Sequence, residues 1–355
     1  MPSIEIRETG RLDERESAFP QATQLPNGDL VCSFSVGGAA HVSGGSDWAR
    51  STDGGRTWQL AGTVLPVDPE HGWANALKTS YDADSKTLYA YGSRIASDTQ
   101  NAFGERATTA IYCRSADEGQ TWSPASEVPF GVDCPLEVSH GILPVGDGRL
   151  LAPAATLPAS DRLGEQVLVA ISDDGGQTWP HTSVVLEDRQ QQRVFFEQKL
   201  AQLGDGRVLA TAWTATRPDY IDEPNSFAIS CDRGTSWGPV QSTGIQGQTM
   251  TPISLGDDRL LVVYNRRYGD QAIIMCLVTI TDDSWTVHHE GILYDAQTQH
   301  QRQASENWQT EELAAFQFGF PTAVVLADGS VLATHWSVEE GRCGIRWTRL
   351  AIDWT

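Results

Sequence analysis

Several titratable side chains of this 355-residue chain stand beside apolar, β-rich runs, where they could act as acids or bases. Glu197 follows Phe195-Phe196, and apolar surroundings raise the pKa of a carboxyl group toward the range of a general acid. The alternative is an ion pair with nearby Lys199 at the end of a strand. His140 and His71 each precede a glycine at the entrance to such a run. A lone histidine is more often structural than catalytic, but two around one site could transfer protons.

A second group of side chains could bind a ligand. Arg266 and Arg267 end the run Tyr264-Asn-Arg-Arg267, and an arginine guanidinium pairs with a carboxylate through two parallel hydrogen bonds. Tyr264 could assist a histidine in removing a proton. Asn75 and Gln248 stand just before the start of a β-rich run, and we expect side chains at these starts to face a shared cavity.

The elements that must position these residues are six short hairpins. Each consists of an apolar run, a turn that most often contains Asn-Gly or Asp-Gly, and a second apolar run, which is a strong local signal of a β-hairpin. The predicted pairs are Phe19–Gly28 with Leu30–Phe34, Ala76–Tyr81 with Thr87–Tyr91, Ser139–Val145 with Arg149–Ala155, Glu197–Leu203 with Arg207–Trp213, Thr249–Leu255 with Arg259–Tyr264, and Phe320–Leu326 with Val331–Trp336. Six such hairpins predict six sheets.

An eight-residue motif recurs between the hairpins every 57 to 64 residues. Its pattern is S-x-D-x-G-x-T/S-W, and the intact copies are Ser51–Trp58, Ser115–Trp122, Ser172–Trp179 and Ser230–Trp237, with a shorter fifth copy at Asp282–Trp285. Asp and Ser side chains hydrogen-bond nearby main-chain N–H groups in tight turns, and glycine adopts the positive φ that such turns require. The tryptophan can cover the turn and donate its indole N–H to a carbonyl. One supersecondary unit therefore repeats, as in the blades of a β-propeller.

These motifs are Asp-box (BNR) repeats, and the chain resembles the sialidase superfamily of six-bladed β-propellers over nearly its whole length. The resemblance implies an all-β fold with residues 1–355 in a single domain. It also implies that the Asp boxes lie at the periphery of the blades, away from the chemistry. The last predicted blade ends after its third strand, Gly344–Ala351, so we expect Ile4–Thr9 to supply the missing outer strand and close the ring.

The resemblance also assigns roles to individual residues. Glu197 matches the family glutamate that polarises a nucleophile, and Asp47 lies near the place of the family's acid/base aspartate. Of the three family arginines that bind the substrate carboxylate, only the third has a counterpart, in Arg266 or Arg267. Trp213 stands near the place of the second.

Two departures argue against the standard sialidase mechanism. Ala18-Phe19-Pro20 replaces the Arg-Ile-Pro sequence that carries the first family arginine. Phe318 and Phe320 stand where the family has its nucleophilic tyrosine, so no hydroxyl is available there. We therefore expect weak or no activity on common sialosides.

Two connections are longer than a hairpin needs, namely Ser93–Thr109 and residues 286–316, of which Ser305–Phe316 has a mildly helical pattern. They are either surface loops or walls of the central pocket, because long ordered loops in compact domains are often functional.

The composition limits the partners of the chain. The formal net charge is −21 and the pI is about 4.6, which argues against a nucleic-acid or anionic-membrane surface, since either needs a basic face. The six cysteines form no CxxC pair, so neither a zinc site nor a disulfide framework is indicated. No cofactor or metal is expected. The sequence shows no signal peptide or membrane-spanning run, and we expect a soluble, cytoplasmic protein.

Three functions remain open. The first is hydrolysis of a glycosidic bond, more readily of an acidic sugar, with Glu197 and Asp47 as the carboxylate pair. The second is a polysaccharide lyase, in which His71, His140 or Tyr264 removes a proton from a uronate while Arg266 neutralises its carboxylate. The third is a non-catalytic propeller that binds a glycan. The substrate-binding residues expected beside these are Arg267, Gln248, Asn75, Lys199 and Trp213.

Overall fold

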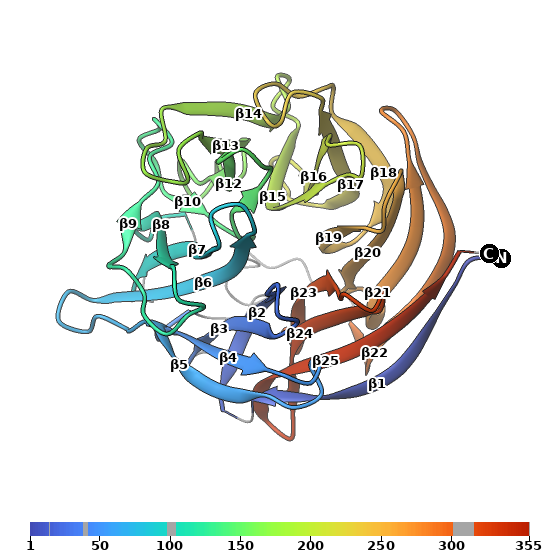
Figure 1. Cartoon of the computed structure of the whole chain (residues 1–355). Coiled ribbons are helices and arrows are strands. Elements are labelled where there is room, and N and C mark those ends of the chain that lie inside the picture. Colours follow the sequence, from blue (N-terminus) through green and yellow to red (C-terminus); the bar gives the residue numbers. More distant parts are fainter. Residues whose placement is uncertain (14, 38–41, 98–103, 301–315, 355) are drawn as a thin grey trace.

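The computed structural model describes residues 1–13, 15–37, 42–97, 104–300 and 316–354. In this part of the chain, strands form six sheets arranged in a ring around a central axis (Figure 1). No helix occurs in these residues, and therefore none that could cross a membrane. The six-bladed, all-β propeller predicted from the hairpins is confirmed.

Each blade is an antiparallel sheet whose first strand lies next to the axis (Figure 1). Blade 1 contains β2 (Ser17–Gln24), β3 (Leu30–Val36), β4 (Ser46–Ser51) and β5 (Gln59–Leu65), and blade 2 contains β6 (Trp73–Asp82), β7 (Thr87–Ala96), β8 (Thr108–Ser115) and β9 (Ser126–Glu127). Blade 3 contains β10 (Leu136–Glu137), β11 (Leu143–Pro144), β12 (Leu150–Thr156), β13 (Gln166–Ser172) and β14 (His181–Glu187). Blade 4 contains β15 (Arg193–Gln202), β16 (Val208–Thr216), β17 (Asp222–Ser230) and β18 (Gln241–Gln246). Blade 5 contains β19 (Gln248–Ser254), β20 (Arg259–Arg266), β21 (Gly269–Ile280) and β22 (Trp285–His300), and blade 6 contains β23 (Phe318–Val325), β24 (Val331–Glu339), β25 (Arg342–Asp353) and β1 (Ser3–Asp13).

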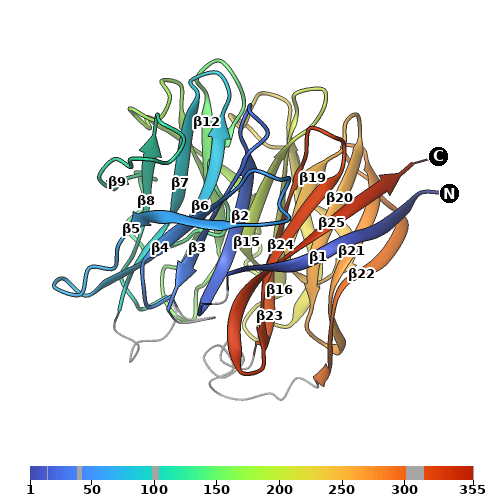
Figure 2. The ribbon, with the colours of Figure 1, turned by 60° about the horizontal axis from the view of Figure 1, so that its bottom comes forward.

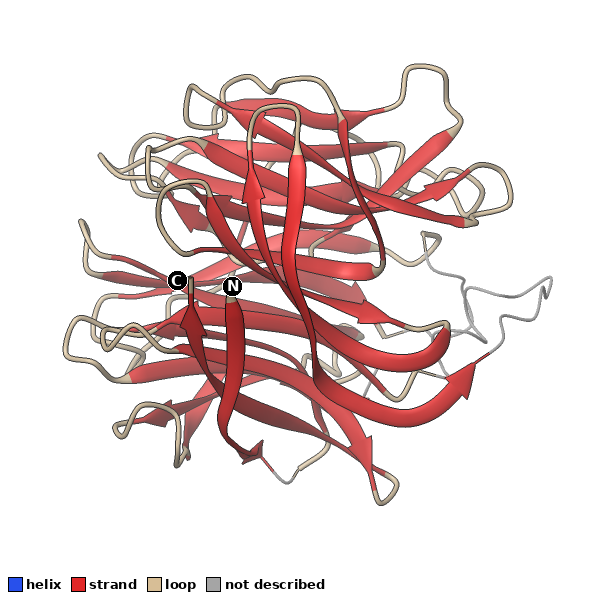
Figure 3. Ribbon diagram, turned by 90° about the vertical axis from the view of Figure 1, so that its right-hand side faces the viewer, coloured by secondary structure: helices blue, strands red, loops and turns tan. Residues whose placement is uncertain are grey.

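The first strand of the chain completes the last blade. β1 pairs with β25, so that Ile4 lies opposite Ile352 and Thr9 opposite Thr348. The N- and C-terminal ends therefore lie side by side, as Figures 2 and 3 show. The predicted closure by the N-terminal strand is confirmed, and β25 does not remain as an unpaired edge.

The two long connections differ from the expected loops. Residues 286–316 are not one loop, because β22 continues to His300 beside β21, with Ile273 opposite Tyr294. Such pairing satisfies the main-chain groups of β21 that a loop would leave exposed. Residues 301–315, which carry nearly all of the mildly helical pattern, and residues 98–103 of the other connection lie outside the described residues.

The four intact motifs form the same turn. In the third copy, the Ser172 hydroxyl donates to Asp174 Oδ1 at 2.8 Å, and Asp174 accepts the main-chain N–H of Thr178 at 2.9 Å and its hydroxyl at 2.6 Å. Hydrogen bonds from Thr178 hold the pKa of Asp174 at about 2. Gly176 has φ of 82°, which suits glycine.

The expected indole-to-carbonyl bond is formed only in the first of the four copies, where Trp58 donates to Gly55 O at 2.9 Å. Trp237 donates to the Ser183 hydroxyl instead, and the indole N–H groups of Trp122 and Trp179 have no partner among the described residues.

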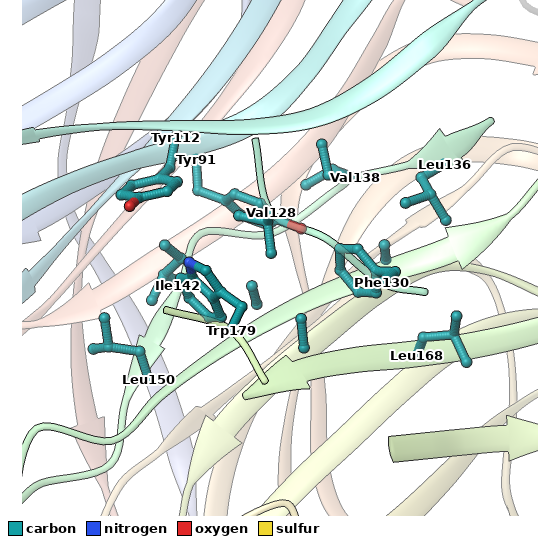
Figure 4. Packing of buried hydrophobic residues seen from close by; sticks show 14 of the residues in the cluster. Tyr91, Tyr112, Val128, Phe130, Leu136, Val138, Ile142, Leu150, Leu168 and Trp179 are labelled. Atoms are coloured by element: carbon teal, nitrogen blue, oxygen red, sulfur yellow. The ribbon is translucent and has the colours of Figure 1, made fainter. Parts of the chain in front are cut away.

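Side chains packed between neighbouring blades form the core. Between blades 2 and 3, Tyr91 and Tyr112 pack with Val138, Ile142 and Trp179 (Figure 4). The rings of Tyr112 and Trp179 meet edge to face with their centres 5.9 Å apart. Since each blade buries its faces only against its neighbours, the ring fixes where the six inner strands meet at the axis.

Candidate active site at the propeller axis

Four of the inner strands carry a β-bulge near their start. Phe19, Glu197, Thr249 and Phe320 each have φ between 49° and 57°, and the strand register shifts at each of them. A left-handed φ is uncommon for residues other than glycine, and a bulge re-aims the side chain that it carries. Because the same bulge occurs in four blades, it directs side chains from several blades toward one level of the axis, which makes this level a candidate site.

Blade 3 has no continuous inner strand at this level. The predicted strand Ser139–Val145 is wrong for residues 139–142, which lie in the connection between β10 and β11. The reason is that lysines from the neighbouring blades take its carbonyl groups: Lys78 Nζ donates to Val138 O at 2.9 Å, and Lys199 Nζ donates to Ser139 O. Two buried side chains thus replace ladder hydrogen bonds.

Two acidic residues meet beside these lysines. The main-chain N–H of Glu197 donates to Glu137 Oε2 at 3.0 Å, and the Ser139 hydroxyl donates to Glu137 Oε1. The Thr249 hydroxyl donates to Glu197 Oε2, which connects blades 4 and 5. We call Glu137, Glu197, Lys78 and Lys199 the axial cluster. Glu137 was not among the residues selected from the sequence.

The axial cluster contains charges that are not paired by contact. Burial lowers the pKa of Lys199 to about 7, with the Glu197 charge opposing the shift and Lys78 adding to it. Burial likewise lowers the pKa of Lys78 to about 8. Burial raises the pKa of Glu137, and the Glu197 charge raises it further. Neither lysine lies within 4.0 Å of a described carboxylate oxygen; instead Lys199 Nζ lies 3.6 Å from the centre of the Phe320 ring. A simple Glu197–Lys199 ion pair is therefore not formed.

His140 lies between the axial cluster and a cavity further along the axis, whose wall it joins. Its Nδ1 is 3.0 Å from Gly141 O, and a carbonyl only accepts, so Nδ1 carries the proton and Nε2 has the lone pair. Burial lowers the pKa of His140 to about 3, and Lys199 adds to this shift. The imidazole is neutral at physiological pH.

Three predicted binding residues are joined in one hydrogen-bonded chain around blades 4 to 6. Trp213 Nε1 donates to Asp222 Oδ1 at 2.7 Å, and Gln248 Nε2 donates to Asp222 Oδ2 at 3.1 Å. Arg267 donates to Gln248 Oε1 at 3.0 Å and to Phe318 O at 2.7 Å. Asp222, which connects the others, was missed from the sequence. Because Glu197 contacts the residue that follows Gln248, this chain borders the axial cluster.

Asp47 and His71 lie away from the axial cluster. Asp47 is held by Arg15 at 2.9 Å and by the Thr63 hydroxyl at 2.7 Å, on the outer side of blade 1. The His71 side chain is 67% exposed and pairs with Asp68 at 2.9 Å. The prediction that His71 lines the axial wall is therefore wrong: a position just before an inner strand does not by itself aim a side chain at the axis.

Three further predicted residues are occupied by structural contacts. Tyr264 is buried in the core between blades 4 and 5, and burial raises its pKa. Arg266 donates to Asp270 O at 2.9 Å within the β20–β21 hairpin. Asn75 accepts from the Ser46 hydroxyl at 2.7 Å and donates to main-chain oxygens of blade 1.

Comparison with known proteins agrees with this architecture. The sequence profile of the BNR repeat-like domain matches residues 47–332. A sialidase from Micromonospora viridifaciens is 29% identical over 249 residues, which are 62% of this chain and 36% of the relative. The chain thus spans about a third of the length of the curated relative it matches.

Solved structures share the fold. A protein of unknown function from Dyadobacter fermentans has a TM-score of 0.78 at 21% identity, covering 99% of this chain and all of that one. The leech intramolecular trans-sialidase has a TM-score of 0.67 at 13% identity, covering 97% and 69%. The α-L-arabinanase of Penicillium chrysogenum has a TM-score of 0.61 at 16% identity, covering 94% and 93%. With its profile match over most of the sequence, the chain belongs to the BNR repeat-like family of the sialidase superfamily.

Proposed function

We propose that this protein is a glycoside hydrolase with Glu137 and Glu197 as its carboxylate pair. The observation that carries the proposal is their direct link at the axis, through the Glu197 N–H and Glu137 Oε2. Glycosidases use two carboxyl groups, one protonated and one ionised, flanking the bond to be broken. Because Glu137 and Glu197 have different surroundings, one of them can be protonated while the other is ionised.

The surroundings assign a role to each carboxyl group. Burial and the nearby Glu197 charge raise the pKa of Glu137. This direction favours Glu137 as the group that donates a proton to the glycosidic oxygen as the bond to the anomeric carbon breaks. Glu197, fixed by the Thr249 hydroxyl, acts as the carboxylate that activates water or attacks the anomeric carbon. Glu137 takes the place expected for Asp47, because Asp47 is held by Arg15 and Thr63.

The sugar that we propose is acidic. Lys78 and Lys199 bring positive charge to the axial cluster: with pKa values of about 8 and 7, Lys78 is mostly protonated at neutral pH and Lys199 is protonated in about half of the molecules. When Glu137 is protonated, this charge exceeds the one negative charge of Glu197. A ligand carboxylate would balance that excess. The matching relative is a sialidase, yet Phe320 offers no hydroxyl for a standard sialidase nucleophile, so we expect a different acidic sugar or linkage.

The test is release of reducing sugar from a panel of sialosides, uronate-containing glycans and arabinan. Hydrolysis of one acidic substrate that is lost in both Glu137→Gln and Glu197→Gln is the expected result. Binding of a glycan with no new reducing end would instead favour the non-catalytic propeller.

A lyase is the second candidate, favoured by the position of His140, whose Nε2 carries the lone pair of the neutral ring; burial makes this nitrogen a weak base, so the lyase ranks below hydrolysis. His140 would take the C5 proton of a uronate while the C4–O bond breaks. The imidazolium so formed would give that proton to the leaving oxygen, so that the products are an unsaturated uronate and a new hydroxyl on the leaving sugar. Ultraviolet absorbance of the product separates the two reactions, because hydrolysis leaves no double bond.

A further inference from the structure

Ser139 belongs to a ring of hydrogen bonds that ties the broken inner strand of blade 3 to β15. Its hydroxyl donates to Glu137 Oε1, and its carbonyl accepts from Lys199 Nζ. The ring is closed at Glu137, whose Oε2 accepts the main-chain N–H of Glu197 at 3.0 Å. Since Glu197 and Lys199 lie on the same strand, β15 holds both the main chain of Ser139 and the carboxyl group of Glu137.

The members of this ring differ in exposure. Lys199 is fully buried, with its Nζ 3.6 Å from the centre of the Phe320 ring. Glu137, Ser139 and Glu197 are half-buried, so part of each keeps its accessible surface. The lysine thus supports the ring from inside the protein, while the Ser139–Glu137 pair lies on its accessible side.

The two partners of the Glu137 carboxyl group are not equivalent. A main-chain N–H can only donate, so the Glu197 N–H suits an oxygen that carries no proton, which is Oε2. A hydroxyl can donate or accept, so Ser139 can keep its hydrogen bond when Oε1 gains a proton, by turning from donor into acceptor. Of these two partners, Ser139 is therefore the one that can serve both protonation states of Glu137.

We propose that Ser139 is a positioning residue for Glu137, which orients the carboxyl group and keeps its proton on Oε1. This inference rests on the proposed function, in which Glu137 is the proton donor. During the reaction the proton moves from Glu137 Oε1 to the glycosidic oxygen as the bond to the anomeric carbon breaks. The Ser139 hydroxyl then turns to donate to the carboxylate that remains, and it neither gains nor loses a proton overall.

Other groups around Glu137 also act on its proton. The charged and titratable groups near it on neighbouring strands are Glu197 and Lys199 on β15, Lys78 on β6 and Tyr91 on β7. Burial and the Glu197 charge raise the pKa of Glu137, while the Ser139 hydroxyl, the Glu197 N–H and the Lys199 charge lower it. Removing the hydroxyl alone should therefore raise the pKa of Glu137 further, because the ionised form loses a hydrogen-bond donor.

The first measurement is the pH profile of hydrolysis in Ser139→Ala, which removes the hydroxyl but keeps the carbonyl that Lys199 binds. We expect kcat to fall roughly tenfold to a hundredfold with less change in KM, because a misdirected reacting group costs rate rather than binding. The alkaline limb should move to higher pH. Ser139→Thr keeps a hydroxyl and should restore both properties. The matched control is Thr251→Val, which removes a hydroxyl that joins blades 5 and 6 by donating to Pro321 O at 2.7 Å.

The second measurement needs no substrate. The isotope-labelled carboxyl carbon of Glu137, assigned by its absence in Glu137→Gln, is titrated by NMR in the full chain. It should titrate at higher pH in Ser139→Ala than in the wild type, and at the wild-type pH in Thr251→Val. If it titrates alike in the wild type and in folded Ser139→Ala, or if Ser139→Ala keeps full kcat, the proposal is wrong. If no substrate is hydrolysed by the wild type, the proposed function fails, and the titration alone decides whether Ser139 holds the proton of Glu137.

Discussion

The main-chain N–H of Glu197 donates to Glu137 Oε2 at 3.0 Å, which joins the bulged inner strand of blade 4 to the broken inner strand of blade 3. The charge of the Glu197 carboxylate raises the pKa of Glu137, and both acids lie at the level where lysines from blades 2 and 4 donate to main-chain carbonyls of blade 3.

Replacing either acid with its amide tests the pair. Glu137→Gln and Glu197→Gln keep shape and an acceptor oxygen but remove the ionisable group, so each should lower kcat by roughly a hundredfold or more if it acts in proton transfer. Melting curves check that both variants are folded. Full hydrolytic activity in either folded variant would remove that residue from the mechanism.

The pH dependence of kcat/KM should identify Glu137 as the acid. Because its pKa is raised, the protonated form persists above the usual range of a glutamate and is lost as the pH rises through that raised value. The alkaline limb of the profile should therefore disappear in Glu137→Gln and persist in Glu197→Gln. A limb unchanged in Glu137→Gln would assign the acid to another group.

The buried lysines make stability depend on pH in a defined direction. Lys199 and Lys78 titrate at about 7 and 8 in the folded chain, below their unfolded value of 10.5. Between these values the unfolded state binds more protons, so stability rises with pH and is lost as the pH falls through 7. Urea unfolding at pH 6.5 and 9 should show this gain, reduced by about 1 kcal/mol or more in Lys199→Met, as one pKa unit corresponds to about 1.4 kcal/mol. The exposed Lys86→Met is the matched control, and an identical reduction in both variants would contradict this account.

The fold follows from local patterns, and for that reason it could be predicted. Asn-Gly and Asp-Gly turns specify hairpins, and each repeat turn is completed by side chains within eight residues, as Ser172, Asp174 and Thr178 show. The same locality explains the error in blade 3. Residues 139–142 have the sequence pattern of a strand, but Lys78 and Lys199, both distant in sequence, donate to the carbonyls of Val138 and Ser139.

Sequence patterns could indicate which side chains lie together at the axis only where the start of a strand determines the direction of a side chain. Glu197, Lys199 and Gln248 lie near the starts of inner strands. Glu137 and Asp222 instead bind residues of the neighbouring blade, and no local sequence pattern predicts such contacts. One signal was present. The chain has only three lysines, at positions 78, 86 and 199, against 22 arginines, and two of the three lie in inner strands. Lysine is rarely buried without a specific partner.

The repeat turns should matter for stability and not for catalysis. Asp174→Ala removes three hydrogen bonds of one turn and should lower the melting temperature by a few degrees, equivalent to about 1–2 kcal/mol. Activity per folded molecule should stay unchanged. The exposed Asp161→Ala is the control, and loss of activity in fully folded Asp174→Ala would contradict a structural role.

Deleting residues 1–10 should open the ring. β1 is the only partner of the outer edge of β25 in the described structure, so its loss leaves a twelve-residue strand with an unpaired edge and invites aggregation. We expect a sharply lower melting temperature and association in size-exclusion chromatography. Removal of residues 1 and 2 alone, which precede β1, should have little effect; an unchanged melt after the full deletion would show that closure does not depend on β1.

The hydrogen bonds that link Trp213, Asp222, Gln248 and Arg267 have a fixed donor-to-acceptor order. A double substitution can test this order. Asp222 accepts from both Trp213 and Gln248, which turns the Gln248 carbonyl toward Arg267. In Asp222→Asn the new amide N–H faces Gln248 Nε2, and rotating the Gln248 amide only moves the clash to Arg267. In Gln248→Glu two carboxylates lie side by side. The double variant Asp222→Asn/Gln248→Glu satisfies every donor again, because the carboxylate at 248 accepts from both neighbours and the total charge is unchanged.

Each single substitution at Asp222 or Gln248 should therefore cost about 1–3 kcal/mol in stability, as buried donors or charges lose their partners, and should raise KM for an acidic ligand by displacing Arg267. The double variant should recover both properties, with a coupling energy of about 1–3 kcal/mol in a double-mutant cycle. If the double variant recovers stability but its KM stays raised, these hydrogen-bonded side chains have a structural role only. Strictly additive effects would show that Gln248 does not relay the position of Asp222 to Arg267.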